Sequence, residues 1–81
     1  MKQLTLRLYT LISQAVRTIG SYNPHKIMFL FEEELYDNEI DLVYNFLLWL
    51  HENELCMGRG NWQSRFKEFK EWERIKKLKS K

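Results

Sequence analysis

Apolar residues recur along the chain with the three- and four-residue spacing that is typical of amphipathic helices. The first stripe predicts a helix over about residues 4–19, with Gly20 as its left-handed C-terminal cap. Its apolar positions are Leu4, Leu8, Leu11, Ile12, Ala15 and Ile19. The leucines at positions 4, 6 and 8 also fit a short strand, but the helical stripe is longer and favours a helix.

The second segment opens with Asn23 and Pro24, which suit the N-cap and first turn of a helix because proline has no N–H to leave unpaired. We expect this helix to span about residues 24–36. Its candidate core residues are Ile27, Met28, Leu30, Phe31 and Leu35. The acids at residues 32–34 would stand near its C-terminal end, where the helix dipole disfavours negative charge. They therefore indicate a surface with a binding role.

The third segment is apolar around most of its circumference and predicts a helix over about residues 38–53, capped by Asp37 or Asn38. Its inner face would carry Ile40, Val43, Phe46, Leu47 and Leu50. Because only a narrow strip of it is polar, this helix should lie at the centre of the fold. It should end near Asn53, because Glu54 would otherwise fall on the buried face.

A turn at residues 58–60, with Asn61 as N-cap, precedes a fourth helix over about residues 62–78. Its aromatic cluster comprises Trp62, Phe66, Phe69 and Trp72. Ile75 and Leu78 leave that face, so the end of this helix should project or dock on another molecule.

Together the four segments predict an all-α fold, a compact bundle of four helices with the apolar third helix at its centre. We expect the 81 residues to form one domain, 1–81. A chain this short buries only about 60% of its unfolded surface, so a homodimer is one way for it to gain stability. The single cysteine, Cys56, excludes an internal disulfide and favours a cytoplasmic location. The longest apolar run, 42–50, is far below the roughly 20 residues of a membrane span, so we expect no membrane partner.

No arrangement of reactive side chains indicates catalysis or metal binding. His25, His51 and Cys56 lack both the paired spacing of a structural zinc site and the orienting group of a nucleophilic triad. The acids that start at Asp37 imitate a calcium loop but lack its later glycine and glutamate, and residues 58–61 lack the lysine of a phosphate loop. We therefore expect a protein that is not an enzyme and has no cofactor.

Charge is distributed unevenly along the chain, although the formal net charge is only +2. Residues 32–41 contain six acids and no base, whereas the basic tail, 74–81, contains five bases and no acid. The residues predicted to contact a protein partner are Glu32, Glu33, Glu34, Asp37, Glu39, Asp41, Trp62, Phe66 and Trp72. The alternative is nucleic-acid binding through Arg59, Arg65, Lys67, Lys70, Arg74, Lys76, Lys77 and Lys79.

The run Leu-Tyr-Asp-Asn-Glu-Ile at residues 35–40, followed by Tyr44, resembles the start of the third helix in the Hha/YmoA family of nucleoid-associated modulators. Lys2, Tyr9 and the Thr-Ile pair at 18–19 are also similar to the first helix of that family. The resemblance implies a four-helix protein that binds a partner of the H-NS type. The family's Ala-Ala-Asp-His-Arg segment is replaced here by Asn-Phe-Leu-Leu-Trp at 45–49.

The second half of the chain resembles small uncharacterised proteins of tailed phages in the segments Trp-Leu-His-Glu-Asn, Gly-Arg-Gly-Asn, Arg-Phe and Phe-Lys between residues 49 and 70. That resemblance implies an accessory role in host takeover or replication. From the residues we expect a small non-enzymatic regulator or inhibitor that binds another protein, one of the host or one associated with nucleic acid. The alternative is an accessory DNA- or RNA-binding protein that uses the basic fourth helix.

Overall fold

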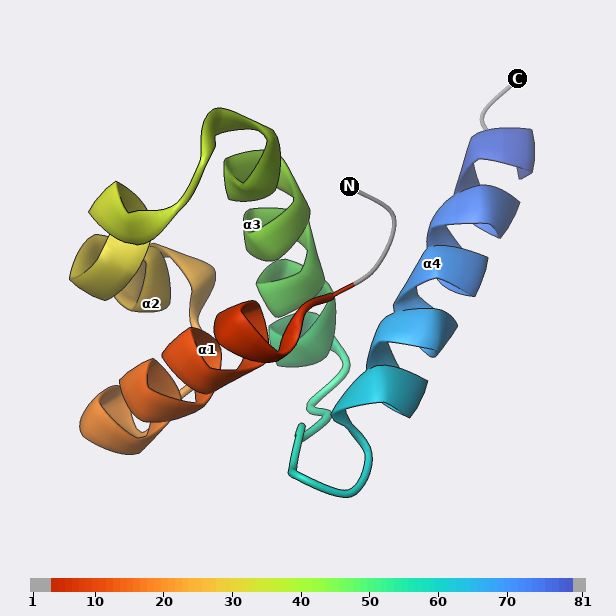
Figure 1. Ribbon diagram of the computed structural model, residues 1–81. Helices are drawn as coiled ribbons and strands as arrows, with labels where there is room; N and C mark the ends of the chain where they lie inside the picture. The colour runs from red at the N-terminus through yellow and green to blue at the C-terminus, as the bar shows by residue number, and fades with distance from the viewer. Residues whose placement is uncertain (1–3, 80–81) are drawn as a thin grey trace.

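The computed structural model describes residues 4–79, except for the side chain of Lys79. Within that range the chain is all-α, with four α-helices, one short 3-10 helix and no strand. The helices are α1 (Leu6–Ile19), α2 (Pro24–Phe31), η1 (Glu32–Glu34), α3 (Asp37–Glu52) and α4 (Trp62–Lys79). Figure 1 shows α3 between the α1–α2 pair on one side and α4 on the other, with α3 and α4 antiparallel. No described helix is both long enough and apolar enough to cross a membrane.

Local capping signals fix the two ends of α1. The Thr5 hydroxyl oxygen accepts a hydrogen bond from the Leu8 N–H at 3.2 Å, so the helix begins two residues later than the predicted position 4. At the other end Gly20 adopts a left-handed φ of 78° and its N–H donates to the Val16 carbonyl, which confirms the predicted cap. Leu4 precedes the helix yet is buried in the core.

The α2 helix begins as predicted but ends five residues early. The Asn23 side-chain oxygen accepts from the N–H groups of His25 and Lys26, which confirms the predicted N-cap. At Phe31 the backbone leaves helical geometry, with φ −141° and ψ 15°, and extended Leu35 then enters the core. The prediction of a helix to residue 36 is therefore wrong. The three acids occupy the separate η1 turn, so the argument from an unfavourable helix dipole does not apply to them.

The α3 helix supplies the centre of the core. Its side chains Val43, Phe46 and Leu47 have no exposed surface. Neither Asp37 nor Asn38 is its cap, because Tyr36 holds the N-cap position and the Glu39 carboxylate accepts from the Tyr36 N–H at 2.9 Å. The helix ends close to the predicted position. Asn53 is its C-cap, where the side-chain amide donates to the Trp49 carbonyl and the next residue adopts φ 55°.

Two contacts hold the loop between α3 and α4 against the rest of the molecule. The Tyr22 hydroxyl accepts from the Met57 N–H at 2.9 Å and donates to the Met57 carbonyl at 3.1 Å. Before α4, the Asn61 side-chain oxygen accepts from the Gly58 N–H at 2.6 Å. Asn61 directly precedes Trp62, and its carbonyl accepts from the Arg65 N–H at 2.8 Å, so it holds the predicted N-cap position. Its side-chain oxygen closes the turn before the helix.

Only the first half of α4 is anchored to the bundle, through an aromatic cluster. The Phe46 ring of α3 lies 5.3 Å from the rings of both Phe66 and Phe69, measured between centroids. The Trp49 ring is 5.8 Å from Phe69. Rings at these separations combine large buried areas with favourable edge and offset contacts. They fix where α4 leaves the body of the protein.

Candidate interaction surfaces

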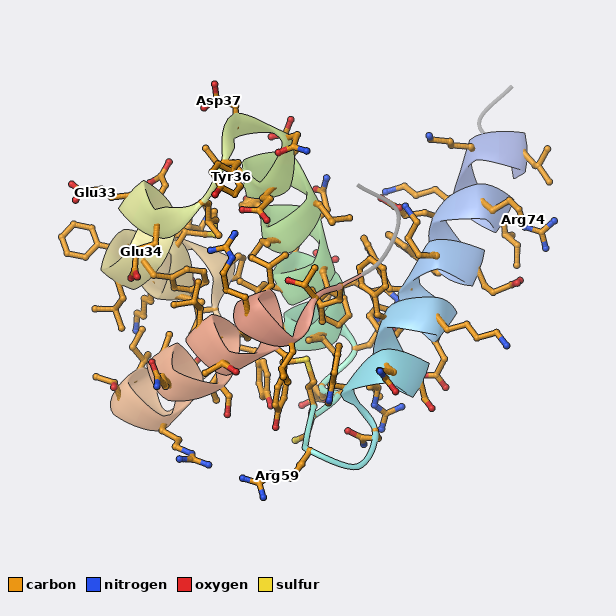
Figure 2. The ribbon with its side chains drawn as sticks, in the orientation of Figure 1. Glu33, Glu34, Tyr36, Asp37, Arg59 and Arg74 are labelled. Atoms are coloured by element: carbon orange, nitrogen blue, oxygen red, sulfur yellow. The ribbon has the colours of Figure 1, made fainter. Side chains whose placement is uncertain are left out.

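The run of acids at residues 32–41 and the bases at the end of α4 lie on opposite sides of the molecule. Figure 2 shows Glu33 and Asp37 pointing outward at one edge, whereas Arg74 points away from the opposite side on α4. Arg59 lies apart from both, on the loop before α4. The uneven charge along the sequence is therefore also a separation of charge in space.

We define the acidic corner as the exposed acids of η1 and of the start of α3. They are Glu32, Glu33, Glu34, Asp37 and Asp41. No carboxylate of the acidic corner forms an ion pair with a described residue. By contrast, every acid of α4 is paired with a base three residues away: Arg65–Glu68 at 3.0 Å, Lys70–Glu73 at 3.3 Å and Arg74–Glu71 at 3.1 Å. The negative charge of the corner is thus available to a partner.

Exposed apolar side chains accompany the acidic corner. Phe29 is 86% exposed, Tyr36 71% and Leu30 48%. Ile27, Met28 and Phe31 occupy the buried side of the short α2, so Phe29 is directed to solvent. The prediction of Leu30 as a core residue is wrong. The sequence did contain a signal for Phe29, because a helical projection of α2 places it opposite Ile27.

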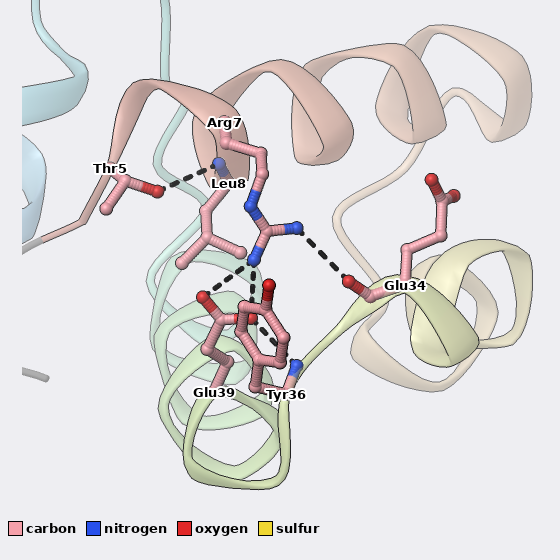
Figure 3. Close-up of polar contacts among 6 residues, drawn as sticks. All are labelled: Thr5, Arg7, Leu8, Glu34, Tyr36 and Glu39. Carbon is pink, nitrogen blue, oxygen red and sulfur yellow. Dashed lines mark hydrogen bonds and ion pairs between the residues drawn. The ribbon is translucent and has the colours of Figure 1, made fainter.

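Glu39 does not belong to the acidic corner, so its prediction as a contact residue is wrong. It is only 5% exposed, and both of its carboxylate oxygens accept from one Arg7 nitrogen, at 2.7 and 2.8 Å. Arg7 also donates to the Glu34 carbonyl at 3.1 Å and lies over the Tyr36 ring. Figure 3 shows Arg7 reaching from α1 to both segments. This Arg7–Glu39 hub is structural, and it fixes η1 and the start of α3 against α1.

The three aromatic residues predicted to contact a partner differ in how far they are buried. Phe66 is 5% exposed and is a core residue, so its prediction as a contact residue is wrong. Trp62 is half-buried and stacks on Tyr9 of α1, with the ring centroids 5.1 Å apart. Only Trp72 remains accessible, at 37%, with the Lys76 ammonium 4.8 Å from the centre of its ring. Phe66 and Trp62 therefore anchor α4, whereas Trp72 lies at the start of its exposed half.

The predicted nucleic-acid contacts are likewise divided. Arg65 donates to the Cys56 carbonyl as well as to Glu68 and is half-buried, so it has a structural role. Lys70 and Arg74 belong to the ion pairs described above. Lys67, Lys77 and Arg59 are exposed and form no ion pair with a described residue. The side chain of Lys79, together with the end of the basic tail at 80–81, lies outside the described residues.

A shallow groove of about 230 Å³ separates the second half of α4 from α3. It is lined by Asn45, Leu48, Trp49, Glu52, Trp72, Glu73, Lys76 and Lys77. Its walls combine the apolar side chains Leu48, Trp49 and Trp72 with charged side chains, and the open space between the helices means that they are not packed together here as they are in the aromatic cluster. The second half of the helix thus extends beside the bundle with little apolar support.

Within residues 4–79, no group of three or more His, Cys, Asp and Glu side chains is placed to hold a metal ion. Cys56 is exposed, and His25 contacts the Tyr44 hydroxyl with its Nε2 at 3.4 Å. No family model, curated protein or solved structure matches this chain. The function proposed below therefore rests on the surfaces of this chain.

Proposed function

We propose that this chain is a small non-enzymatic regulator that binds another protein through the acidic corner and the apolar side chains beside it. The observation that carries the proposal is the presence, within the one segment 29–41, of acids that form no ion pair with a described residue and of the exposed side chains Phe29, Leu30 and Tyr36. Carboxylates without internal partners lose no ion pair when a basic partner binds. Aromatic side chains next to them supply the apolar area from which most binding energy comes.

The chemistry of this surface defines the class of partner. A basic surface with apolar side chains between its cations would complement both parts of it. Protein surfaces that bind nucleic acid are basic in this way, because they neutralise phosphates with lysine and arginine. A regulator that covers such a surface would act as an inhibitor by competing with the nucleic acid.

The Arg7–Glu39 hub supports the proposal by giving the acidic corner a fixed shape. Arg7 joins the Glu34 backbone to α1, and Glu39 holds the first turn of α3. The acids therefore project from a preformed scaffold, and binding does not have to order a loop. Such preorganisation lowers the entropic cost of association.

A helical peptide with arginines along one face and leucines along the other is a suitable probe, which we call the Arg–Leu peptide. In a titration monitored by NMR, we expect the largest changes in amide chemical shift at residues 29–41. The acidic-corner variant Glu32→Gln, Glu33→Gln, Asp37→Asn should weaken binding by about tenfold or more. The control, Glu68→Gln, Glu71→Gln, Glu73→Gln, changes the net charge equally and should weaken binding much less. Equal losses in the two variants would contradict the proposal.

A double variant tests the apolar part of the surface. Phe29→Ala with Tyr36→Ala leaves the charge unchanged and should still weaken binding several-fold, because exposed rings are removed. The chain should also displace the Arg–Leu peptide from a DNA duplex, as read by fluorescence anisotropy. If removing the two rings leaves the affinity unchanged, binding depends on charge alone. The acidic corner would then act as a nonspecific polyanion, and the proposal would be overturned.

Nucleic-acid binding through α4 is the second candidate function. The observation in its favour is that Lys67, Lys70, Arg74 and Lys77 follow the spacing i, i+3, i+7 and i+10, which places them on one face of the helix. Two of the four are already paired with Glu73 and Glu71, which reduces the charge available to phosphate. For this reason we rank it below protein binding.

The salt dependence of binding to a short duplex tests the second candidate. Four phosphate contacts would give a slope of about −3 to −4 for log K against log salt. Lys67→Gln with Lys77→Gln should reduce the magnitude of that slope by about 2, whereas Arg17→Gln on α1 should leave it unchanged. A duplex that does not bind even at low salt would exclude this function.

A further inference from the structure

The apolar residues of α4 wind around the helix instead of staying on one face. They occur at every third position, Phe66, Phe69, Trp72, Ile75 and Leu78, and each step of three turns the stripe by about 60°. Their exposure rises along the stripe from 5% and 0% to 37%, 46% and 66%. The first two face α3, and the last two have turned away from it.

The second half of α4 consequently presents a face that α3 does not cover. Ile75 lies on this face, Trp72 lies at its border with the groove toward α3 and is 37% exposed, and positions 68 and 79 continue the face in either direction. These four positions have the spacing 4, 3 and 4, which is the spacing of a helix that packs along another helix. Ile75, at 46%, and Leu78, at 66%, are exposed, so a second helix can reach this half of α4.

The order of charges along α4 indicates which helix would pack there. Within residues 68–79, the half before the centre contains the acids Glu68, Glu71 and Glu73 and one base, Lys70, whereas the half after it contains four bases and no acid. Two copies side by side in the same direction would set acids against acids and bases against bases. Two antiparallel copies would set the acidic half of each against the basic half of the other.

We propose that the second half of α4 is the contact between two copies of this chain, packed antiparallel around a two-fold axis between positions 73 and 74. In this register Trp72 lies opposite Ile75 of the second copy, and position 68 lies opposite position 79. The contact is self-complementary, as a two-fold interface must be. Lys67 and Lys70 lie on the other side of the helix, so their like charges do not meet.

The interface consists of one pair of helices and is small. Specific interfaces of standard size bury about 1,200 to 2,000 Å², and contacts below that range belong to weak or transient complexes. The two copies should therefore be in reversible equilibrium with the monomer. The apolar centre should persist in salt, whereas the flanking charge contacts should weaken as salt screens them.

Sedimentation of the full chain over a range of concentrations tests the contact. We expect the mass to rise from monomer toward dimer between about 10 µM and 1 mM, as for other small interfaces. Ile75→Asp should leave a monomer throughout. Leu6→Asp is the control, because Leu6 is an exposed apolar residue, at 65%, on a different helix. A monomer for the unaltered chain at every concentration, or equal loss in both variants, would overturn the proposal.

A distance measurement tests the direction of the two helices. A single spin label at Gln63→Cys, in a Cys56→Ser background, sits near the start of α4. Antiparallel packing about positions 73 and 74 separates the two labels by about 30 Å, because the helix rises about 1.5 Å per residue. Parallel packing would bring them to about 10 Å, the usual spacing of helix axes. The short distance would exclude the antiparallel contact even if a dimer forms, and circular dichroism verifies that each variant remains helical.

Discussion

Glu33 and Glu39 are the same residue type, six positions apart, with opposite roles. Glu33 is exposed and without an ion pair among the described residues, whereas Glu39 is buried and accepts from both Arg7 and the Tyr36 N–H. The difference arises from the Tyr36 N–H, three residues before Glu39, and above all from Arg7, which is 32 residues away from Glu39 in sequence. Sequence reasoning could therefore recognise the cluster of acids, but it could not separate the structural member from those facing solvent.

Glu39→Gln should destabilise the protein by about 2 kcal/mol, because it removes a buried charged acceptor from its partly exposed Arg7 partner and weakens the cap of α3. Glu33→Gln removes the same charge from an exposed site and should change stability by less than about 0.5 kcal/mol. Urea unfolding monitored by tryptophan fluorescence measures both. Similar effects of the two substitutions would show that Arg7 and Glu39 do not form the hub.

Tyr22→Phe should lower the free energy of unfolding by about 1 to 2 kcal/mol, because both the N–H and the carbonyl of Met57 lose their partner at a partly buried position. Tyr44→Phe is the matched control, since its hydroxyl makes one long contact with His25 at an exposed position. The same unfolding experiment should rank the two variants. A larger loss for Tyr44→Phe would mean that the loop before α4 does not depend on the Tyr22 hydroxyl.

At the scale of the elements, the sequence identified all four α-helices, because most of their ends are set by local signals. Gly20, Asn23 with Pro24, and Asn53 stop or start helices through their own backbone and side-chain chemistry. The early end of α2 has no comparable local signal. The chain leaves helical geometry at Phe31 and then buries Leu35, and that outcome depends on how α2 packs against the other helices.

Gly20→Ala tests the local part of this account. Gly20 has φ 78°, so a Cβ there would be strained by about 1 kcal/mol even though it would meet no atom within 4 Å. A Cβ at Gly60 would also stand in open space, and the backbone there carries no such restriction. Gly60→Ala should be neutral or slightly stabilising. In thermal unfolding, the midpoint temperature should therefore fall for Gly20→Ala only. Equal midpoints for the two variants would contradict the role of Gly20 as a left-handed cap.

At the scale of the whole molecule, the uneven charge was visible in the sequence but its geometry was not. The runs of acids and bases predicted two regions of opposite sign, and the fold places the acids on η1 and the start of α3 and the bases on α4, at the opposite side of the molecule. Leu30 was predicted as a core residue because it lies within an apolar segment that is typical of a core. An eight-residue helix cannot bury every side of itself, so the position of Phe29 opposite Ile27 indicated its exposure, whereas the exposure of Leu30 depends on the packing.

The separation of the acidic corner from α4 leads to a prediction that joins the two proposed surfaces. A dimer through α4 would carry its two acidic corners at distant ends, so both could bind at once. On a surface dense in the Arg–Leu peptide, the unaltered chain should dissociate at least about tenfold more slowly than Ile75→Asp, because a second bound site holds the dimer in place. With the free peptide in solution, the two should bind with equal affinity at each corner.

Leu6→Asp should behave like the unaltered chain in both formats, since it touches neither surface. Weaker binding of the free peptide by Ile75→Asp would mean that α4 itself contributes to the peptide site, which contradicts the independence of the two surfaces. Equal dissociation from the dense surface, for a chain that sedimentation has shown to dimerise, would mean that the second corner cannot reach a peptide. Because the acidic corner and the proposed α4 contact are spatially separated in this fold, one substitution on α4 is sufficient to distinguish valency from affinity.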